Sequence, residues 1–98
     1  MSGGLRTITP VDGSVYVERP YATAAEVARA LAAAAAQETW KRVPVAERAA
    51  FCSRAVDAFV AEREAVAAEI SWQMGRPVRF APGEVDGFEE RARYMIGA

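Results

Sequence analysis

Histidine is absent from the 98 residues, and cysteine occurs once, at Cys52. The missing histidine removes the commonest general base and the commonest metal ligand of proteins. A single cysteine cannot form an internal disulfide or a Cys-x-x-Cys zinc or redox site, and it fits a reduced setting. The sequence therefore excludes a histidine triad and argues against redox chemistry within this chain.

An excess of one charge and a long apolar run are also missing. Twelve Lys and Arg stand against 13 Asp and Glu, for a net charge of −1, which argues against a nucleic-acid partner. The longest uncharged window, Ala30 to Gln37, is far shorter than the roughly 20 apolar residues that cross a bilayer. Residues 1–5 lack the apolar core of a secretory signal. We expect a cytoplasmic protein with no membrane partner.

Apolar residues make up 52 % of the chain, which is typical of a folded protein. The first ordered feature is a pair of β-favouring runs around Pro-Val-Asp-Gly at 10–13, where glycine permits the positive φ of a tight turn. This pattern predicts a β-hairpin over residues 7–19. A lone two-stranded hairpin is marginally stable in water, so we expect it to lie against helices or another sheet edge.

The first predicted helix spans residues 23–41. Thr23 and Glu26 have the spacing of a capping box, in which the two side chains bind the free N–H groups of the first helical turn. Val27 and Leu31, with alanines around them, form a thin apolar stripe at helical spacing. A proline at position 44 disfavours the helical conformation of the residue before it and ends this element.

Two further helices are predicted after that proline. Residues 45–74 contain no proline or glycine, and apolar residues recur at helical spacing with one gap at Arg63, so we expect one long helix. Gly75 suits the left-handed position that ends such a helix. Pro82 then opens a third helix, over residues 82–97.

The predicted middle helix is longer than the diameter of a compact chain of this size. Thirty residues of helix measure ~45 Å, whereas a compact body of 98 residues has a diameter of ~34 Å. Part of the apolar stripe and the free edge of the hairpin therefore need to be covered by a second copy of the chain or by further sequence. We predict an α+β fold, mainly α, with a hairpin and three helices, and interpret residues 1–98 as one partial domain.

Several short strings follow one another in a characteristic order. Residues 9–13 read Thr-Pro-Val-Asp-Gly, residues 22–27 open an Ala-rich helix, residues 44–49 read Pro-Val-Ala-Glu-Arg-Ala, and residues 73–77 read Gln-Met-Gly-Arg-Pro. Together they resemble the N-terminal segment of NAD(P)-dependent aldehyde dehydrogenases, where the corresponding strings include Asn-Pro-x-x-Gly, Pro-x-x-x-Arg and Glu-Met-Gly-Lys-Pro. The departures from the family pattern, at Gln73 and Arg76, fall at a helix end. The resemblance covers nearly the whole chain.

The resemblance implies the opening part of a Rossmann-type α/β cofactor-binding domain. It also implies a full-length parent that binds NAD or NADP and oxidises an aldehyde to a carboxylic acid, by thiolate attack, hydride transfer to the nicotinamide and hydrolysis of the thioester. In that family the reacting groups lie downstream of the matching segment. We therefore expect this chain to be inert, to bind no cofactor, and to have the rest of the parent chain or a second copy as its partner.

We assign no residue a catalytic, cofactor-binding or metal-binding role. Cys52 lies on the predicted apolar stripe with Val56 and Phe59, so we expect it to be a buried core residue and no nucleophile. Gly75 lacks the companion glycines and the preceding strand of a phosphate-binding loop. The arginines that follow it, Arg76 and Arg79, are expected to be solvated charges near a helix C-terminus.

The remaining candidates are acidic and aromatic side chains. The carboxylates have no companion metal ligands and are expected to form solvated helix faces: Glu62, Glu64, Glu69, Asp86, Glu89 and Glu90. The aromatic residues are expected to supply core area instead of a binding surface: Tyr16, Tyr21, Trp40, Trp72 and Tyr94. A different class of function stays open, a free-standing helical module that dimerises or docks on a partner through its apolar stripe.

Overall fold

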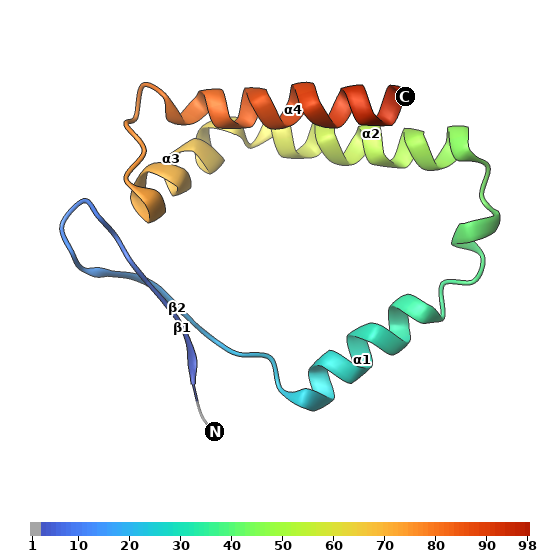
Figure 1. Cartoon of the computed structure of the whole chain (residues 1–98), viewed down its shortest axis with the longest axis horizontal. Helices are drawn as coiled ribbons and strands as arrows, with labels where there is room; N and C mark the ends of the chain where they lie inside the picture. The colour runs from blue at the N-terminus through green and yellow to red at the C-terminus, as the bar shows by residue number, and fades with distance from the viewer. Residues whose placement is uncertain (1–2) are drawn as a thin grey trace.

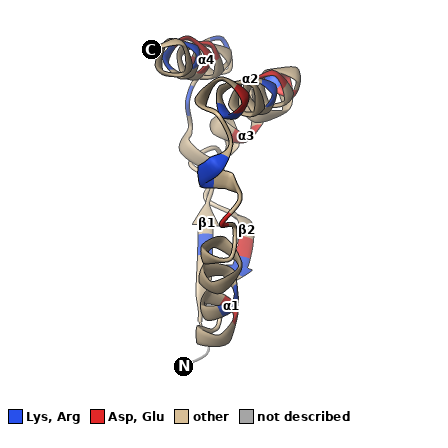
Figure 2. Cartoon of the chain, turned by 90° about the vertical axis from the view of Figure 1, so that its right-hand side faces the viewer, with Lys and Arg blue, Asp and Glu red and all other residues tan. Residues whose placement is uncertain are grey.

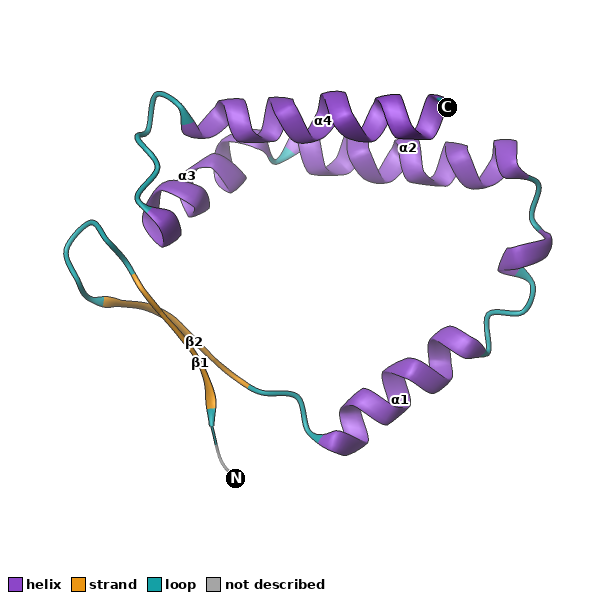
Figure 3. Ribbon diagram, viewed as in Figure 1, coloured by secondary structure: helices purple, strands orange, loops and turns teal. Residues whose placement is uncertain are grey.

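The computed structural model describes residues 3–98, as a hairpin followed by helices (Figure 1). The elements are β1 (Gly4–Ile8), β2 (Val15–Pro20), α1 (Ala24–Ala35), a 3₁₀ turn at Trp40–Arg42, α2 (Val45–Ala61), α3 (Arg63–Met74) and α4 (Ala81–Gly97). The predicted class, mainly helical with an N-terminal hairpin, is confirmed. The described residues contain one two-stranded sheet, β1 and β2, which is orange in Figure 3.

The hairpin is antiparallel and begins earlier than expected, at Gly4. Its turn is closed by Thr9, whose N–H donates to the Ser14 carbonyl at 2.9 Å, and by Gly13, whose φ of 78° is accessible to glycine. The register places Thr7 opposite Val17 and Ile8 opposite Val15. Tyr16 is therefore the extra residue of a β-bulge, which redirects its side chain out of the ladder.

Helix α1 has the predicted capping box. Thr23 Oγ1 accepts from the Glu26 N–H at 3.1 Å, and Glu26 Oε2 accepts from the Thr23 N–H at 2.9 Å. The helix ends at Ala35, so the extension to residue 41 is wrong. Every residue of α1 is exposed. An isolated helix of this length is marginal in water, and it ends where the alanine run ends because no packing supports another turn.

The single helix expected over residues 45–74 is also wrong, because it is broken at Glu62. Glu62 has φ −95° and ψ 18°, and its N–H donates to Phe59, three residues back, instead of four. The break coincides with the gap in the apolar pattern at Arg63. The Arg63 guanidinium binds Asp86 of α4 through Nε–Oδ1 at 2.8 Å and Nη2–Oδ2 at 3.0 Å. Figure 1 shows the result: α2 runs beside α4, and α3 turns toward the hairpin.

The buried apolar residues come from these last three helices. Val56 of α2 and Ala67 of α3 are each 5 % exposed, and Ala81 and Val85 of α4 are almost fully buried. Phe59 and Phe88 add an aromatic contact between α2 and α4, with ring centroids 4.6 Å apart. Helix α4 is therefore the element that joins α2 and α3 into one layer.

The hairpin and α1 extend away from that layer. The radius of gyration is 17.7 Å, against about 13 Å for a compact chain of this length. The molecule measures 49 × 40 × 17 Å and is thin when it is seen edge-on (Figure 2). Charged residues are interspersed along the ribbon of α2, α3 and α4, whereas α1 carries few (Figure 2).

Gly75 lies where the hairpin turn packs against the end of α3. It has φ 76° as the C-cap of α3, and its N–H donates to the Ser71 carbonyl. A Cβ at this position would lie 3.1 Å from Cβ of Pro10 in the hairpin turn. Gly75 therefore both ends the helix in a left-handed conformation and lets the turn approach closely.

Gly75→Ala is predicted to destabilise the fold by about 1–2 kcal/mol, because alanine is strained at positive φ and also crowds Pro10. Gly87→Ala is the control: Gly87 lies within α4, a Cβ there meets nothing within 4 Å, and alanine favours the helix by about 0.5–1 kcal/mol. Urea unfolding followed by helical circular dichroism measures both variants. Equal stability of the two variants would contradict the account of Gly75.

Candidate functional site

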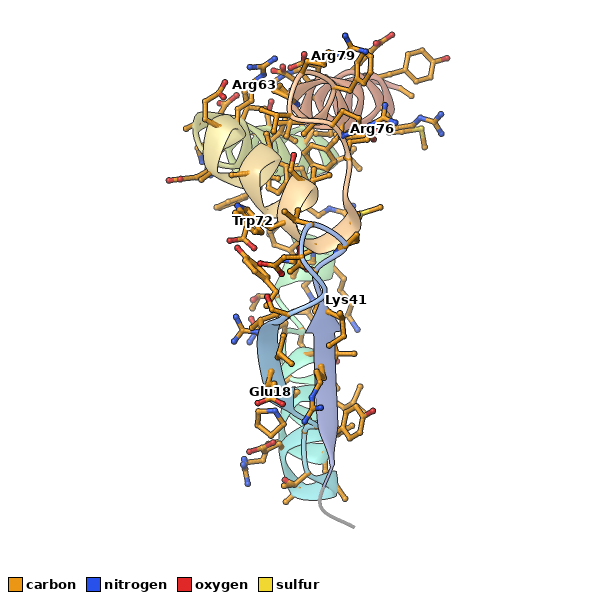
Figure 4. The ribbon with its side chains drawn as sticks, turned by 90° about the vertical axis from the view of Figure 1, so that its left-hand side faces the viewer. Glu18, Lys41, Arg63, Trp72, Arg76 and Arg79 are labelled. Carbon is orange, nitrogen blue, oxygen red and sulfur yellow. The ribbon has the colours of Figure 1, made fainter. Side chains whose placement is uncertain are left out.

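A cluster of side chains connects the hairpin to α3. The Tyr16 ring stacks on Trp72, with centroids 6.0 Å apart and planes at 5°. The Tyr16 hydroxyl donates to Glu69 Oε1 at 2.8 Å, and Gln73 Nε2 donates to Glu69 Oε2 at 2.8 Å. Glu69, Trp72 and Gln73 share one helix face because they are three and four residues apart. Figure 4 shows Trp72 where α3 meets the hairpin.

The electrostatics of this cluster follow from its hydrogen bonds. The bond from Gln73, and then the bond from Tyr16, lower the pKa of Glu69 below its ordinary 4.5. The bond to Glu69 raises the pKa of Tyr16 above its ordinary 10.0. An open groove of ≈ 430 Å³ lies beside the cluster, lined also by Leu5, Thr7, Val17 and Arg19. The arrangement holds two elements together, and it contains no nucleophile beside a base.

The carboxylates considered above lie on the surface or at its margin. Asp86 and Glu64 both contact Arg63, and Glu89 accepts from Arg93 Nε at 2.9 Å. The hydrogen bond from Arg63 lowers the pKa of Asp86. Within residues 3–98 no three His, Cys, Asp or Glu side chains are grouped so that they could hold a metal ion. Of these three carboxylates Asp86 joins two helices, α3 and α4, whereas Glu64 and Glu89 each pair within their own helix.

The arginines that follow α3 have partners within the chain. Arg76 Nε lies 3.1 Å from Glu84 Oε1, and the Arg79 guanidinium lies 4.6 Å from the centre of the Phe80 ring. Gly75 itself follows a helix and faces Pro10. This loop does not fit a dinucleotide phosphate, which needs backbone N–H groups open to the ligand after a strand.

Cys52 is exposed, so the buried position expected for it is wrong for this chain. The aromatic residues differ from expectation in the same way: Trp72 is 43 % and Tyr94 75 % exposed, and only Tyr16 is half-buried. Helical spacing places Cys52 on an apolar stripe that the described chain leaves exposed, and the Tyr16 ring covers Trp72 only in part. Large apolar side chains are exposed on every element: Leu5, Ile8, Val15, Val27, Leu31, Val45, Phe51, Met74, Phe80 and Met95.

Sequence comparison decides the family. The pattern that defines the aldehyde dehydrogenase family matches residues 2–98. The chain belongs to the aldehyde dehydrogenase family. The resemblance drawn from its short strings is thereby confirmed, and the structure places two of those strings, the turn at residues 9–13 and the helix stop at residues 73–77, side by side.

Individual aldehyde dehydrogenases agree with this assignment. The chain is 35 % identical over 86 residues to 3,6-anhydro-alpha-L-galactose dehydrogenase of Streptomyces coelicolor, covering 87 % of this chain and 18 % of that protein. It is 34 % identical over 96 residues to the EPTC-inducible aldehyde dehydrogenase of Rhodococcus erythropolis, and 39 % identical over 96 residues to a probable aldehyde dehydrogenase of Mycobacterium tuberculosis. Each of these two alignments covers 92 % of this chain and 18 % of the relative. The chain thus spans about a fifth of the length of the curated relatives it matches.

A membrane span is not found: none of the helices in residues 3–98 combines the length and the apolar character needed to cross a bilayer.

The pH dependence of the Tyr16 cluster is a direct test of its geometry. The lowered pKa of Glu69 stabilises the contact above pH 4.5, and this contribution is lost as the pH falls through the lower folded value. The raised pKa of Tyr16 stabilises the contact below pH 10.0, and this contribution is lost as the pH rises through the higher folded value. We expect Tyr16→Phe to abolish the alkaline loss and to reduce the acid loss.

Trp72 fluorescence in a Trp40→Phe background reports the contact. Tyr94→Phe removes a hydroxyl from an exposed ring. It is expected to leave both the acid loss and the alkaline loss of the contact unchanged. If Tyr16→Phe also matched the parent profile, the hydrogen bond to Glu69 would not be what couples the hairpin to α3.

Proposed function

We propose that this chain is the N-terminal structural portion of an NAD(P)-dependent aldehyde dehydrogenase, which as a whole oxidises an aldehyde to a carboxylic acid. The family match and the names of the relatives support the reaction class. We also propose a cytoplasmic setting, because a single cysteine in these 98 residues fits a reducing compartment. In this proposal residues 1–98 are part of one larger domain and carry no catalytic group.

The observation that carries the structural role is the surface of the chain. Its accessible area is 7733 Å², whereas a compact protein of 10.6 kDa exposes about 5500 Å². The excess, about 2200 Å², is the size of an obligate protein–protein interface. Helix α1 contributes to it with Leu31, which is 66 % exposed on an element with no buried residue. We propose that the rest of the aldehyde dehydrogenase domain covers this area.

The chemistry of the described residues supports our proposal that the isolated chain is inert. The thiol of Cys52 lies on α2 with no histidine anywhere in the sequence to act as its base. The only glycine that ends a helix in a left-handed conformation, Gly75, faces Pro10 and leaves no open phosphate cradle in residues 3–98. When bound to the whole protein, the nicotinamide cofactor would supply hydride acceptance, and the residues of this chain would only support its domain.

Reconstitution tests the proposal. The 98-residue chain is expected to show no aldehyde oxidation and no binding of NAD or NADP at millimolar concentration. Co-expressed with the remainder of its parent, it is expected to restore NAD(P)-dependent aldehyde oxidation that the remainder alone lacks. Leu31→Asp places a charge on the exposed face of α1 and is expected to weaken reconstitution at least about tenfold, because a charge cannot be buried unpaired.

Glu38→Lys is the matched control, since it reverses a charge on the exposed loop after α1 that pairs only with Lys41. It should reconstitute like the parent chain. A remainder that is fully active without residues 1–98 would refute the structural role. A chain that forms a stable, compact dimer on its own would favour the helical dimerisation module instead.

A further inference from the structure

The two edges of the hairpin differ in how they are protected. Tyr21 N–H donates to the Gly3 carbonyl, and hydrogen-bonded pairs alternate with non-hydrogen-bonded pairs along an antiparallel ladder. Counting from that bond, Arg6 and Glu18 form a non-hydrogen-bonded pair. Their side chains meet at 2.8 Å, as close pairs of this kind do, and their backbone N–H and C=O groups point outward, one set on each edge.

The β2 edge is interrupted on both sides of Glu18. The bulge at Tyr16 distorts the ladder, and Pro20 has no N–H to donate. Bulges and prolines are the devices by which sheets prevent further pairing at an edge. The β1 edge has neither device: Gly4–Ile8 is a regular strand with no proline. Of the two edges, only that of β1 is open to a new strand.

We infer that the β1 edge pairs with an extended strand from the remainder of the aldehyde dehydrogenase chain, which makes the hairpin a three-stranded sheet. This inference rests on the proposed function. Polypeptide equal to about four-fifths of the relatives' length lies outside the matched region and is available to supply the strand. A two-stranded hairpin is marginal alone, and a third strand would add to the stability that its contact with α3 already gives.

A second copy of this chain is a poorer occupant for the same edge. Antiparallel pairing of β1 with its own copy in full overlap would place Arg6 directly opposite Arg6, because Arg6 is the middle residue of Gly4–Ile8. Like charges directly opposite each other destabilise a sheet. A strand of different sequence avoids this repulsion.

The side chains of β1 define the chemistry of the incoming strand. Leu5 and Thr7 lie on the face that lines the groove beside Glu69 and Gln73, and Leu5 is 60 % exposed. Residues of the new strand that stand beside Leu5 and Thr7 would be apolar, so that they cover the exposed Leu5 side chain. The residue that stands beside Arg6, on the opposite face, would be polar or acidic.

A matched pair of proline variants in the full-length protein tests the inference. Arg6→Pro and Glu18→Pro each remove one outward N–H, each break the same ion pair, and each leave the hydrogen bonds between β1 and β2 in place. We expect Arg6→Pro to reduce the yield of active protein at least about tenfold and Glu18→Pro to leave it within about twofold of the parent protein. Similar losses for both variants would overturn the third strand.

Hydrogen exchange gives a readout that does not depend on the variants. In the full-length protein the Arg6 amide is expected to exchange at least about tenfold more slowly than in the 98-residue chain, whereas the Glu18 amide keeps its fast rate. Fast exchange at Arg6 in a protein that oxidises aldehydes would rule out the strand and leave the proposed function intact. A full-length protein with no aldehyde oxidation would refute the proposed function, and exchange at Arg6 would still decide the strand.

Discussion

Apolar surface is buried only where a second element lies against it, and in this chain α4 is the element that provides most of that contact. Val85 and Ala81 are covered because α2 and α3 both pack on α4, and Val56 and Ala67 are the residues buried in return. The small size of these side chains lets the helices approach closely but yields little hydrophobic free energy. The hairpin and α1 lie outside this contact, so their apolar faces stay exposed.

The sequence predicts correctly those ends of helices that are determined by residues close together in the chain. The capping box at Thr23 and the stop at Gly75 are decided by hydrogen bonds and φ values within a few residues, and both are where the sequence indicated. The break at Glu62 lies beside the ion pair between Arg63 and Asp86, a contact across 23 residues that local signals do not reveal. The gap in apolar spacing at Arg63 was its only trace in the sequence.

Burial was predicted less well than secondary structure. Periodicity shows which residues share a face, and it placed Cys52 on an apolar stripe, but it does not show whether anything covers that stripe. Cys52 is exposed, and so is Trp72, which was expected to supply core area as an aromatic residue. The cluster around Tyr16 was missed for a related reason, because a bulge follows from the pairing register of two strands. The spacing that puts Glu69, Trp72 and Gln73 on one helix face was not used to predict it, and is the signal that could have indicated a contact there.

The described residues do not close into a globule by themselves. Small-angle X-ray scattering on the isolated chain, with the mass determined in the same sample, measures this. We expect a monomer with a radius of gyration near 17.7 Å. A monomer near 13 Å, the value for a compact chain of this length, would contradict it.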